Sequence, residues 1–113
     1  MAVEIGKGQG FEGMKKKANP ETCRAHVFYI GRVQGVGFRY TAERLALDLK
    51  LMGWVKNLSD NRVELLCEGP KETIEELLRR IRESAVGRYI QKADCSWEKP
   101  THEFKDFRVE FYL

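Results

Sequence analysis

The order of apolar and polar positions divides most of the chain into strand-like and helix-like segments. Residues 25–33 are apolar with β-branched and aromatic members, which is typical of a buried strand. Apolar residues recur every three or four positions over residues 38–49, which predicts a helix that ends near Lys50 and buries one stripe. A second helix is predicted after Gly69-Pro70, with the proline in its first turn. The apolar stripe of this second helix consists of Ile74, Leu77, Leu78, Ile81 and Ala85.

The remaining segments alternate with a period of two or carry turn residues. Residues 52–57 predict a short strand, and Asp60-Asn61 predicts a tight turn because both residues tolerate left-handed backbone. Three further strands are predicted over residues 63–68, 89–98 and 107–112. The first of these alternates cleanly, so we expect one covered and one more open face of the sheet.

The predicted element order is β-α-β-β-α-β with a short last strand, which is the split βαβ plan of ferredoxin-like folds. We therefore expect an α+β sandwich with two helices on one face of an antiparallel sheet. Right-handed crossovers make the first two strands parallel, with the third antiparallel between them. The carboxyl ends of the first two strands then lie at one sheet edge, so Asn57 faces the loop that follows the first strand.

The first 22 residues differ from the rest, since they hold four of the ten glycines and the run Lys15-Lys16-Lys17. We expect residues 1–22 to form a flexible extension in front of one domain, residues 23–113. Residues 8–13 match the dinucleotide pattern G-x-G-x-x-G. Because no strand precedes them and no amphipathic helix follows, chance in a glycine-rich segment is the better explanation.

Bulk composition excludes several function classes. The net charge of +3 is too small to indicate nucleic-acid binding. The chain has no apolar stretch long enough to span a bilayer and no apolar signal core, so we expect a cytoplasmic monomer without a membrane partner. The three cysteines are widely spaced without a CxxC pair, which favours reduced thiols over zinc ligands. His26 and His102 lie far apart, and neither is interpreted as catalytic.

The most specific chemistry lies in residues 31–39, Gly-Arg-Val-Gln-Gly-Val-Gly-Phe-Arg. This segment predicts a strand end, a glycine turn and a helix start, whose amides and guanidinium all favour an anion at one point. An arginine can donate to two phosphate oxygens at once. Together with Asn57, the pocket offers no evident nucleophile, acid pair or metal cluster. An acyl phosphate suits such a pocket, because its carboxylate leaving group has a pKa near ~4 and needs no general acid.

Two motifs resemble those of one family. Residues 31–39 resemble the acylphosphatase signature G-x-V-Q-G-V-x-F-R, and residues 53–57, Gly-Trp-Val-Lys-Asn, resemble its second motif. The resemblance covers residues 24–113 and implies hydrolysis of acyl phosphates to a carboxylate and inorganic phosphate, without metal or cofactor and with phosphate as an inhibitor. It also implies that Arg39 binds phosphate and that Asn57 positions the attacking water. The implied phosphate loop consists of Gln34, Gly35, Val36, Gly37, Phe38 and Arg39.

Some positions depart from the family pattern or allow two interpretations. Lys50 stands where a glycine commonly ends the first helix, and left-handed geometry there costs a lysine about 1 kcal/mol. Leu58 follows Asn57 where a small hydroxyl residue is frequent. Gln34 is open to two roles, bracing the loop or contacting substrate. Phe38 and Trp54 are expected to pack in the core.

Two other functions remain open from the sequence. The first is a non-catalytic module that binds phosphate or carbamoyl phosphate. Residues 36–39 also resemble the N-terminal acylphosphatase-like domain of hydrogenase-maturation carbamoyltransferases, which are larger and carry zinc-binding domains. The second is an RNA-binding domain of the same fold plan. Residues 63–68 lack the aromatic stacking pair of such domains and place two glutamates on the open face.

Overall fold

The computed structural model describes residues 21–111, so residues 1–20 of the predicted extension, with its glycine motif and lysine run, lie outside the described part. The elements are β1 (Thr22–Gly31), α1 (Phe38–Asp48), β2 (Met52–Asn57), β3 (Val63–Pro70), α2 (Lys71–Glu83), the short 3₁₀ helix η2 (Gly87–Tyr89), β4 (Ile90–Glu98) and β5 (Phe107–Glu110). The two α-helices and the short final strand follow the predicted order.

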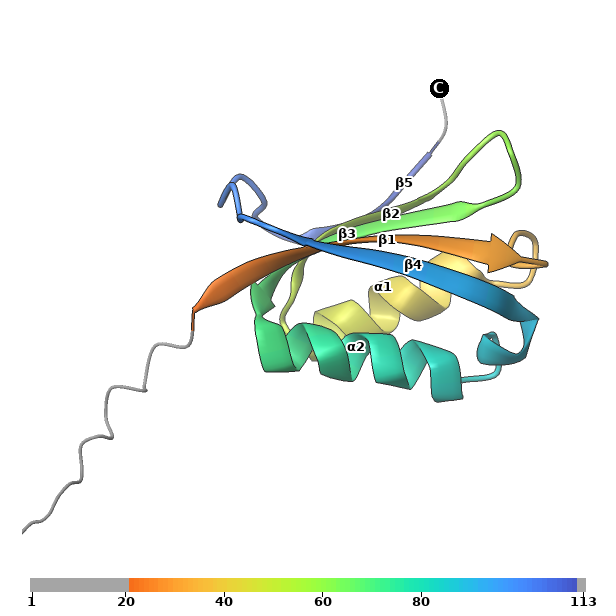
Figure 1. The fold of residues 1–113 in the computed structure, drawn as a ribbon, viewed down its shortest axis with the longest axis horizontal. Coiled ribbons are helices and arrows are strands. Elements are labelled where there is room, and N and C mark those ends of the chain that lie inside the picture. The colour runs from red at the N-terminus through yellow and green to blue at the C-terminus, as the bar shows by residue number, and fades with distance from the viewer. Residues whose placement is uncertain (1–20, 112–113) are drawn as a thin grey trace, which may run out of the picture.

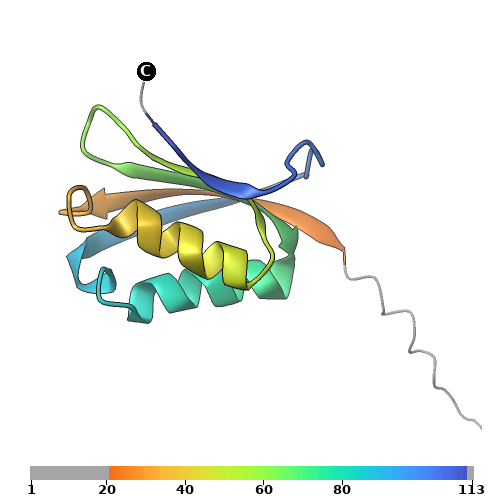
Figure 2. The ribbon, with the colours of Figure 1, turned by 180° about the vertical axis from the view of Figure 1, so that it is seen from behind.

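The strands form one sheet in the order β4-β1-β3-β2-β5. β3 is antiparallel to β1 on one side and to β2 on the other, so β1 and β2 are parallel to each other, as predicted. Both helices cover the same face of this sheet (Figures 1 and 2). β5 joins β2 in parallel, which makes the sheet mixed rather than purely antiparallel. The α+β ferredoxin-like architecture is confirmed.

The core lies between the helices and the inner face of the sheet. Its fully buried members include Val27, Phe38, Val55, Leu65, Ile74, Leu77 and Ile81. Burial raises the pKa of the Cys67 thiol to about 12, so this cysteine is a neutral core residue. No helix of residues 21–111 is both long enough and apolar enough to cross a membrane.

Several details differ from the sequence-based expectation, including the final strand, which ends at Glu110 rather than extending over residues 107–112. β1 begins at Thr22 and ends at Gly31, earlier than residues 25–33, because its pairing with β3 extends to Pro70. Pro70 is the N-cap of α2 rather than a residue of its first turn, and its ψ of 139° is the extended backbone that a cap requires. The helix ends at Glu83, so Ala85 is exposed and Val86 takes the buried position.

The outer face of the sheet is less open than predicted. Leu66 is buried on it because β3 is the central strand, and its cross-strand partners His26 and Trp54 flank it. Trp54 is therefore an outer-face residue, half-buried beneath Lys56, and not part of the core. By contrast, β4 is an edge strand that stays exposed from Gln91 onward despite its alternating sequence.

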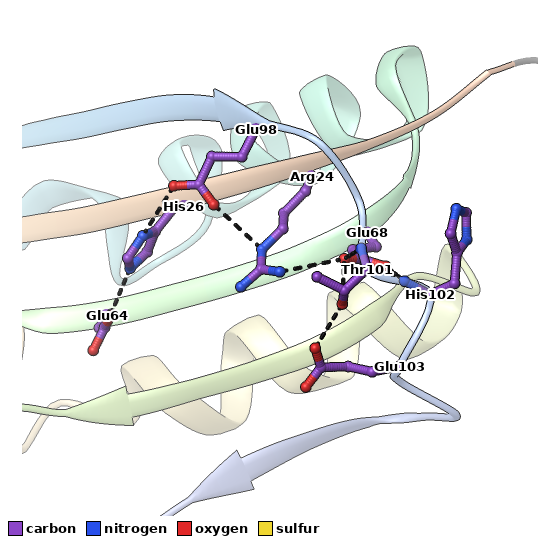
Figure 3. Close-up of polar contacts among 8 residues, drawn as sticks. All are labelled: Arg24, His26, Glu64, Glu68, Glu98, Thr101, His102 and Glu103. Carbon is purple, nitrogen blue, oxygen red and sulfur yellow. Dashed lines mark hydrogen bonds and ion pairs between the residues drawn. The ribbon is translucent and has the colours of Figure 1, made fainter.

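At one end of this outer face, the segment between β4 and β5 folds back over β3 (Figure 3). Glu68 is 6% exposed and accepts hydrogen bonds from the backbone N–H of Thr101 (2.7 Å) and His102 (3.0 Å). Arg24 lies 3.7 Å from the same carboxylate. A single buried carboxylate thus holds the connection, and we refer to these contacts as the Glu68 clamp.

Candidate active site

The loop between β1 and α1 is shaped by its backbone. Gly35 has φ 78° and Gly37 has φ 85°, which is the left-handed region that glycine adopts without steric cost. A Cβ at either position would meet no atom within 4 Å, so these glycines supply conformation rather than space. Val33, which lies between β1 and Gly35, is fully buried and anchors the start of the loop in the core.

The N-terminus of α1 directly follows the β1–α1 loop, so its free amides lie next to the amides of the loop. The first backbone bond of the helix runs from Thr41 N–H to the Gly37 carbonyl at 3.0 Å, so the amides of residues 38–40 have no partner within the helix. Phe38 is buried against Tyr29, with ring centroids 4.8 Å apart, and this packing fixes where the helix begins. The first turn contains no acidic residue, so its partial positive charge is available to an anion.

Gln34 joins this loop to the β2–β3 hairpin. Its side-chain nitrogen donates to the carbonyls of Leu58 and Arg62, each at 2.8 Å. Both amide hydrogens are used in this way, and the remaining side-chain oxygen is an acceptor that a phosphate cannot use. The contacts agree with the bracing interpretation of Gln34, and we refer to them as the Gln34 clamp.

Asn57 is the last residue of β2 and pairs with Val63 across the hairpin. Its side-chain Oδ1 is buried and has no hydrogen-bond partner in the part of the chain that the structure describes. Buried polar atoms are almost always hydrogen-bonded in folded proteins, so this oxygen is an acceptor open to a water molecule or another small donor. The Asn57 amide is therefore suited to holding a small polar molecule.

The hairpin that carries Asn57 is itself held by Asp60. The Asp60 carboxylate accepts the Arg62 backbone N–H at 3.2 Å and the Arg62 Nε at 2.8 Å. The backbone hydrogen bond, aided by the guanidinium, keeps the pKa of Asp60 below its usual value. Asn61 adopts φ 76° at the turn, which confirms half of the predicted left-handed pair.

Arg39 lies in the first turn of α1 and is half-buried. Its Cζ is 5.9 Å from the centroid of the Tyr40 ring and 5.2 Å from that of the Phe111 ring. The sequence pattern predicts only a final strand around Phe111 and does not indicate this contact with Arg39. The signal that would have identified it is the parallel pairing of β5 with β2, which is not visible in one sequence.

The predicted juxtaposition of the two motifs is present. The β1–α1 loop, the β2–β3 hairpin and the C-terminal end of β5 lie at the same end of the molecule in both ribbon views (Figures 1 and 2). His26 instead lies on the outer sheet face, 2.5 Å from Glu64, and His102 lies in the Glu68 clamp. Residues 21–111 contain no group of three or more His, Cys, Asp or Glu side chains arranged to hold a metal.

The fold and the loop define a class: small ferredoxin-like domains with a glycine turn between the first strand and the first helix. The acylphosphatase family model matches residues 25–109, and the chain belongs to that family. A Roseiflexus acylphosphatase is 38% identical over 79% of this chain and 96% of its own. A Trichormus variabilis acylphosphatase is 44% identical over 71% of this chain and 79% of its own.

Solved structures agree with this assignment. The crystal structure of the Bacillus subtilis acylphosphatase has a TM-score of 0.73 at 31% identity and covers 78% of this chain and 98% of that one. Full-length HypF, in a phosphate- and nucleotide-bound form, has a TM-score of 0.70 at 26% identity, but the match spans 12% of that chain. The family assignment makes this protein an acyl phosphate hydrolase, and it does not favour the RNA-binding or non-catalytic alternatives.

Proposed function

We propose that residues 34–39 and Asn57 carry this hydrolysis. Arg39 and the backbone amides of the loop bind the phosphoryl group of an acyl phosphate, and Asn57 orients the attacking water. The observation that carries the proposal is the buried Asn57 Oδ1, which has no partner among residues 21–111 and lies in the hairpin that Gln34 ties to the β1–α1 loop. Gln34 takes part by holding the loop rather than by donating to phosphate.

Hydrolysis of an acyl phosphate requires few groups beyond these. The water attacks phosphorus in line with the departing oxygen, and the P–O bond to the acyl group breaks to release a carboxylate. The Asn57 carbonyl oxygen accepts a hydrogen bond from the water, which points a lone pair at phosphorus. The Arg39 guanidinium and the amides offset the charge on the phosphoryl oxygens as the bond breaks. A carboxylate with a pKa near ~4 leaves without protonation, so the residues need supply no general acid.

The test is steady-state hydrolysis of benzoyl phosphate in the presence of EDTA. We expect the wild type to be active, and Arg39→Ala to lose about 10³-fold or more in kcat/KM together with phosphate binding. Asn57→Ala should lose roughly 10²–10³-fold in kcat while KM changes little, because the water rather than the substrate loses its partner. Inorganic phosphate should inhibit the wild type competitively.

Matched controls exist on the same elements. Arg44→Ala removes an exposed arginine from the same helix, and Asn61→Gly alters the same hairpin; both should retain wild-type activity. Full activity in Arg39→Ala or in Asn57→Ala would contradict the assignment of that residue. Loss of wild-type activity in EDTA would contradict the metal-independent mechanism.

We further propose that the protein acts as a cytoplasmic monomer without a nucleic-acid partner. The three cysteines, which all lie in the described part of the chain, are free thiols, which is typical of a reducing compartment. Glu64 of β3 and Glu98 of β4 place negative charge on the outer sheet face, which disfavours binding of a nucleic-acid backbone there. Light scattering at micromolar concentration tests the monomer, and a dimer mass would contradict it.

A further inference from the structure

The end of β5 lies at the proposed site because of its register with β2. The two strands are parallel, with Gly53 opposite Phe107 and Lys56 opposite Glu110. Phe111 directly follows β5, and Asn57, the last residue of β2, directly follows Lys56. The chain therefore leaves β5 at the sheet edge where the β1–α1 loop and Asn57 lie, and the first residue after the strand is the aromatic Phe111.

The Phe111 side chain is mostly exposed and contributes little to the core. Phe111 is 60% exposed, whereas Phe107, the first residue of β5, is 3% exposed and belongs to the core. Its contact is instead with Arg39, whose Cζ lies 5.2 Å from the ring centroid. This distance is within the range of a cation–π interaction, in which the negative face of the ring attracts the guanidinium.

A ring in this place has a specific consequence for phosphate binding. A guanidinium is a planar fork whose N–H groups point outward from its edges, so a ring on its flat face leaves those edges available to oxygen. An arginine that is already held in one orientation loses less conformational freedom when an anion binds. Tyr40, whose ring centroid is 5.9 Å from the same Cζ, makes a longer contact of the same kind.

We propose that Phe111 is a positioning residue that holds the Arg39 guanidinium ready to bind the phosphoryl group. The inference rests on the proposed function of Arg39 and extends it to a residue at the other end of the chain. The proposed role depends on the aromatic face of the side chain. A tryptophan at position 111 should therefore preserve phosphate binding, whereas a leucine, which is equally apolar but not aromatic, should weaken it.

The test compares Phe111→Leu with Phe111→Trp. We expect Phe111→Leu to raise both the KM for benzoyl phosphate and the Ki for inorganic phosphate roughly two- to fivefold. Its kcat should stay within about twofold of wild type, because ground state and transition state lose the same contact. Phe111→Trp should keep wild-type KM and Ki. Wild-type constants in Phe111→Leu, or equal losses in both variants, would overturn the proposal.

Trp97 provides the matched control. It is another exposed aromatic residue on a cation, with the Lys71 Nζ 5.0 Å from its ring centroid, but it lies on β4 opposite Ala25, away from the loop. Trp97→Leu should leave KM and Ki unchanged. If KM and Ki rose as much as in Phe111→Leu, the effect would belong to exposed aromatic residues in general, and the role of Phe111 would be overturned.

A measurement without turnover separates this inference from the proposed function. The Arg39 Nε–H signal in a ¹⁵N-correlated NMR spectrum should carry a ring-current shift from Phe111, which disappears in Phe111→Leu and persists in Trp97→Leu. An Arg39 signal that is the same in wild type and Phe111→Leu would overturn the contact. Absence of wild-type hydrolysis would instead contradict the proposed function, whatever the NMR result.

Discussion

The two ends of the central strand β3 are held by clamps of opposite chemical character. At the end near the proposed site, the Gln34 amide donates to the carbonyls of Leu58 and Arg62. At the far end, the Glu68 carboxylate accepts from the backbone amides of Thr101 and His102. Each clamp uses one side chain to hold two backbone groups of a distant segment, but only the second carries a charge.

The difference in charge between the two clamps follows from whether each end lies beside the proposed phosphate site. A carboxylate beside the Arg39 loop would repel the phosphoryl group and compete for the same donors, so a neutral amide is the compatible clamp there. The far end lies away from the proposed phosphate loop, and a carboxylate there makes stronger hydrogen bonds while Arg24 offsets its charge at 3.7 Å. Stability and catalysis should therefore respond separately when the two clamps are altered.

The largest expected effect comes from removing the Glu68 clamp. Glu68→Ala leaves two backbone amides and part of the Arg24 guanidinium without their buried acceptor, so the free energy of unfolding should fall by about 3 kcal/mol. Urea denaturation measures this change. The folded variant should keep its kcat/KM for benzoyl phosphate within about twofold, because the clamp does not contact the loop.

Glu98→Ala is the control for this variant. Glu98 also pairs with Arg24, at 3.4 Å, but its side chain is 40% exposed, so its loss should cost less than about 1 kcal/mol. A tenfold drop in the kcat/KM of folded Glu68→Ala, or equal destabilisation by both variants, would remove the distinction between the two ends.

The next effect concerns catalysis. Gln34→Glu directs an acceptor at two carbonyl oxygens and adds a negative charge beside the phosphate loop, so kcat/KM should fall roughly 10²-fold. Gln34→Met, which removes the hydrogen bonds without adding charge, should show a smaller loss of activity. The comparison of kcat/KM for these two variants measures the charge contribution. Equal losses in both would mean that bracing alone matters and that the neutral amide is not required.

The parts of the site that depend on adjacent residues could be predicted from the sequence. The order strand, glycine turn and helix fixed the place of Arg39, and right-handed crossovers fixed which sheet edge Asn57 would share. The positive φ of Lys50 also followed from its position after the helix, and φ is 59°. These features need only local rules and one topological rule.

The features that were missed depend on contacts between distant segments. Glu68 was placed on an open face, but residues more than thirty positions away fold over it. Phe111 directly follows β5, so its contact with Arg39 depends on the parallel pairing of β5 with β2, which no local pattern encodes. Alternation in β4 likewise predicted a strand correctly but not its exposure, because burial depends on whether the strand lies at the sheet edge.

The smallest effect compares left-handed residues at the two ends. Lys50 follows the C-cap of α1 at the far end. Its N–H donates to the Leu47 carbonyl at 3.0 Å, and the N–H of Leu51 donates to the Ala46 carbonyl at 2.9 Å. This pair of bonds is the Schellman arrangement, whose left-handed position normally holds glycine. Lys50→Gly should raise the free energy of unfolding by about 0.5–1 kcal/mol without changing kcat/KM, as urea denaturation and kinetics can show.

Asn61 gives the matched comparison at the site end, since its φ is 76° in the β2–β3 hairpin. Asparagine tolerates this conformation better than lysine because its short polar side chain can hydrogen-bond locally. Asn61→Gly should therefore stabilise the protein by less than half as much as Lys50→Gly. If Asn61→Gly gave the larger gain, backbone strain would be concentrated beside Asn57 rather than at the far end, and the hairpin would be the strained element.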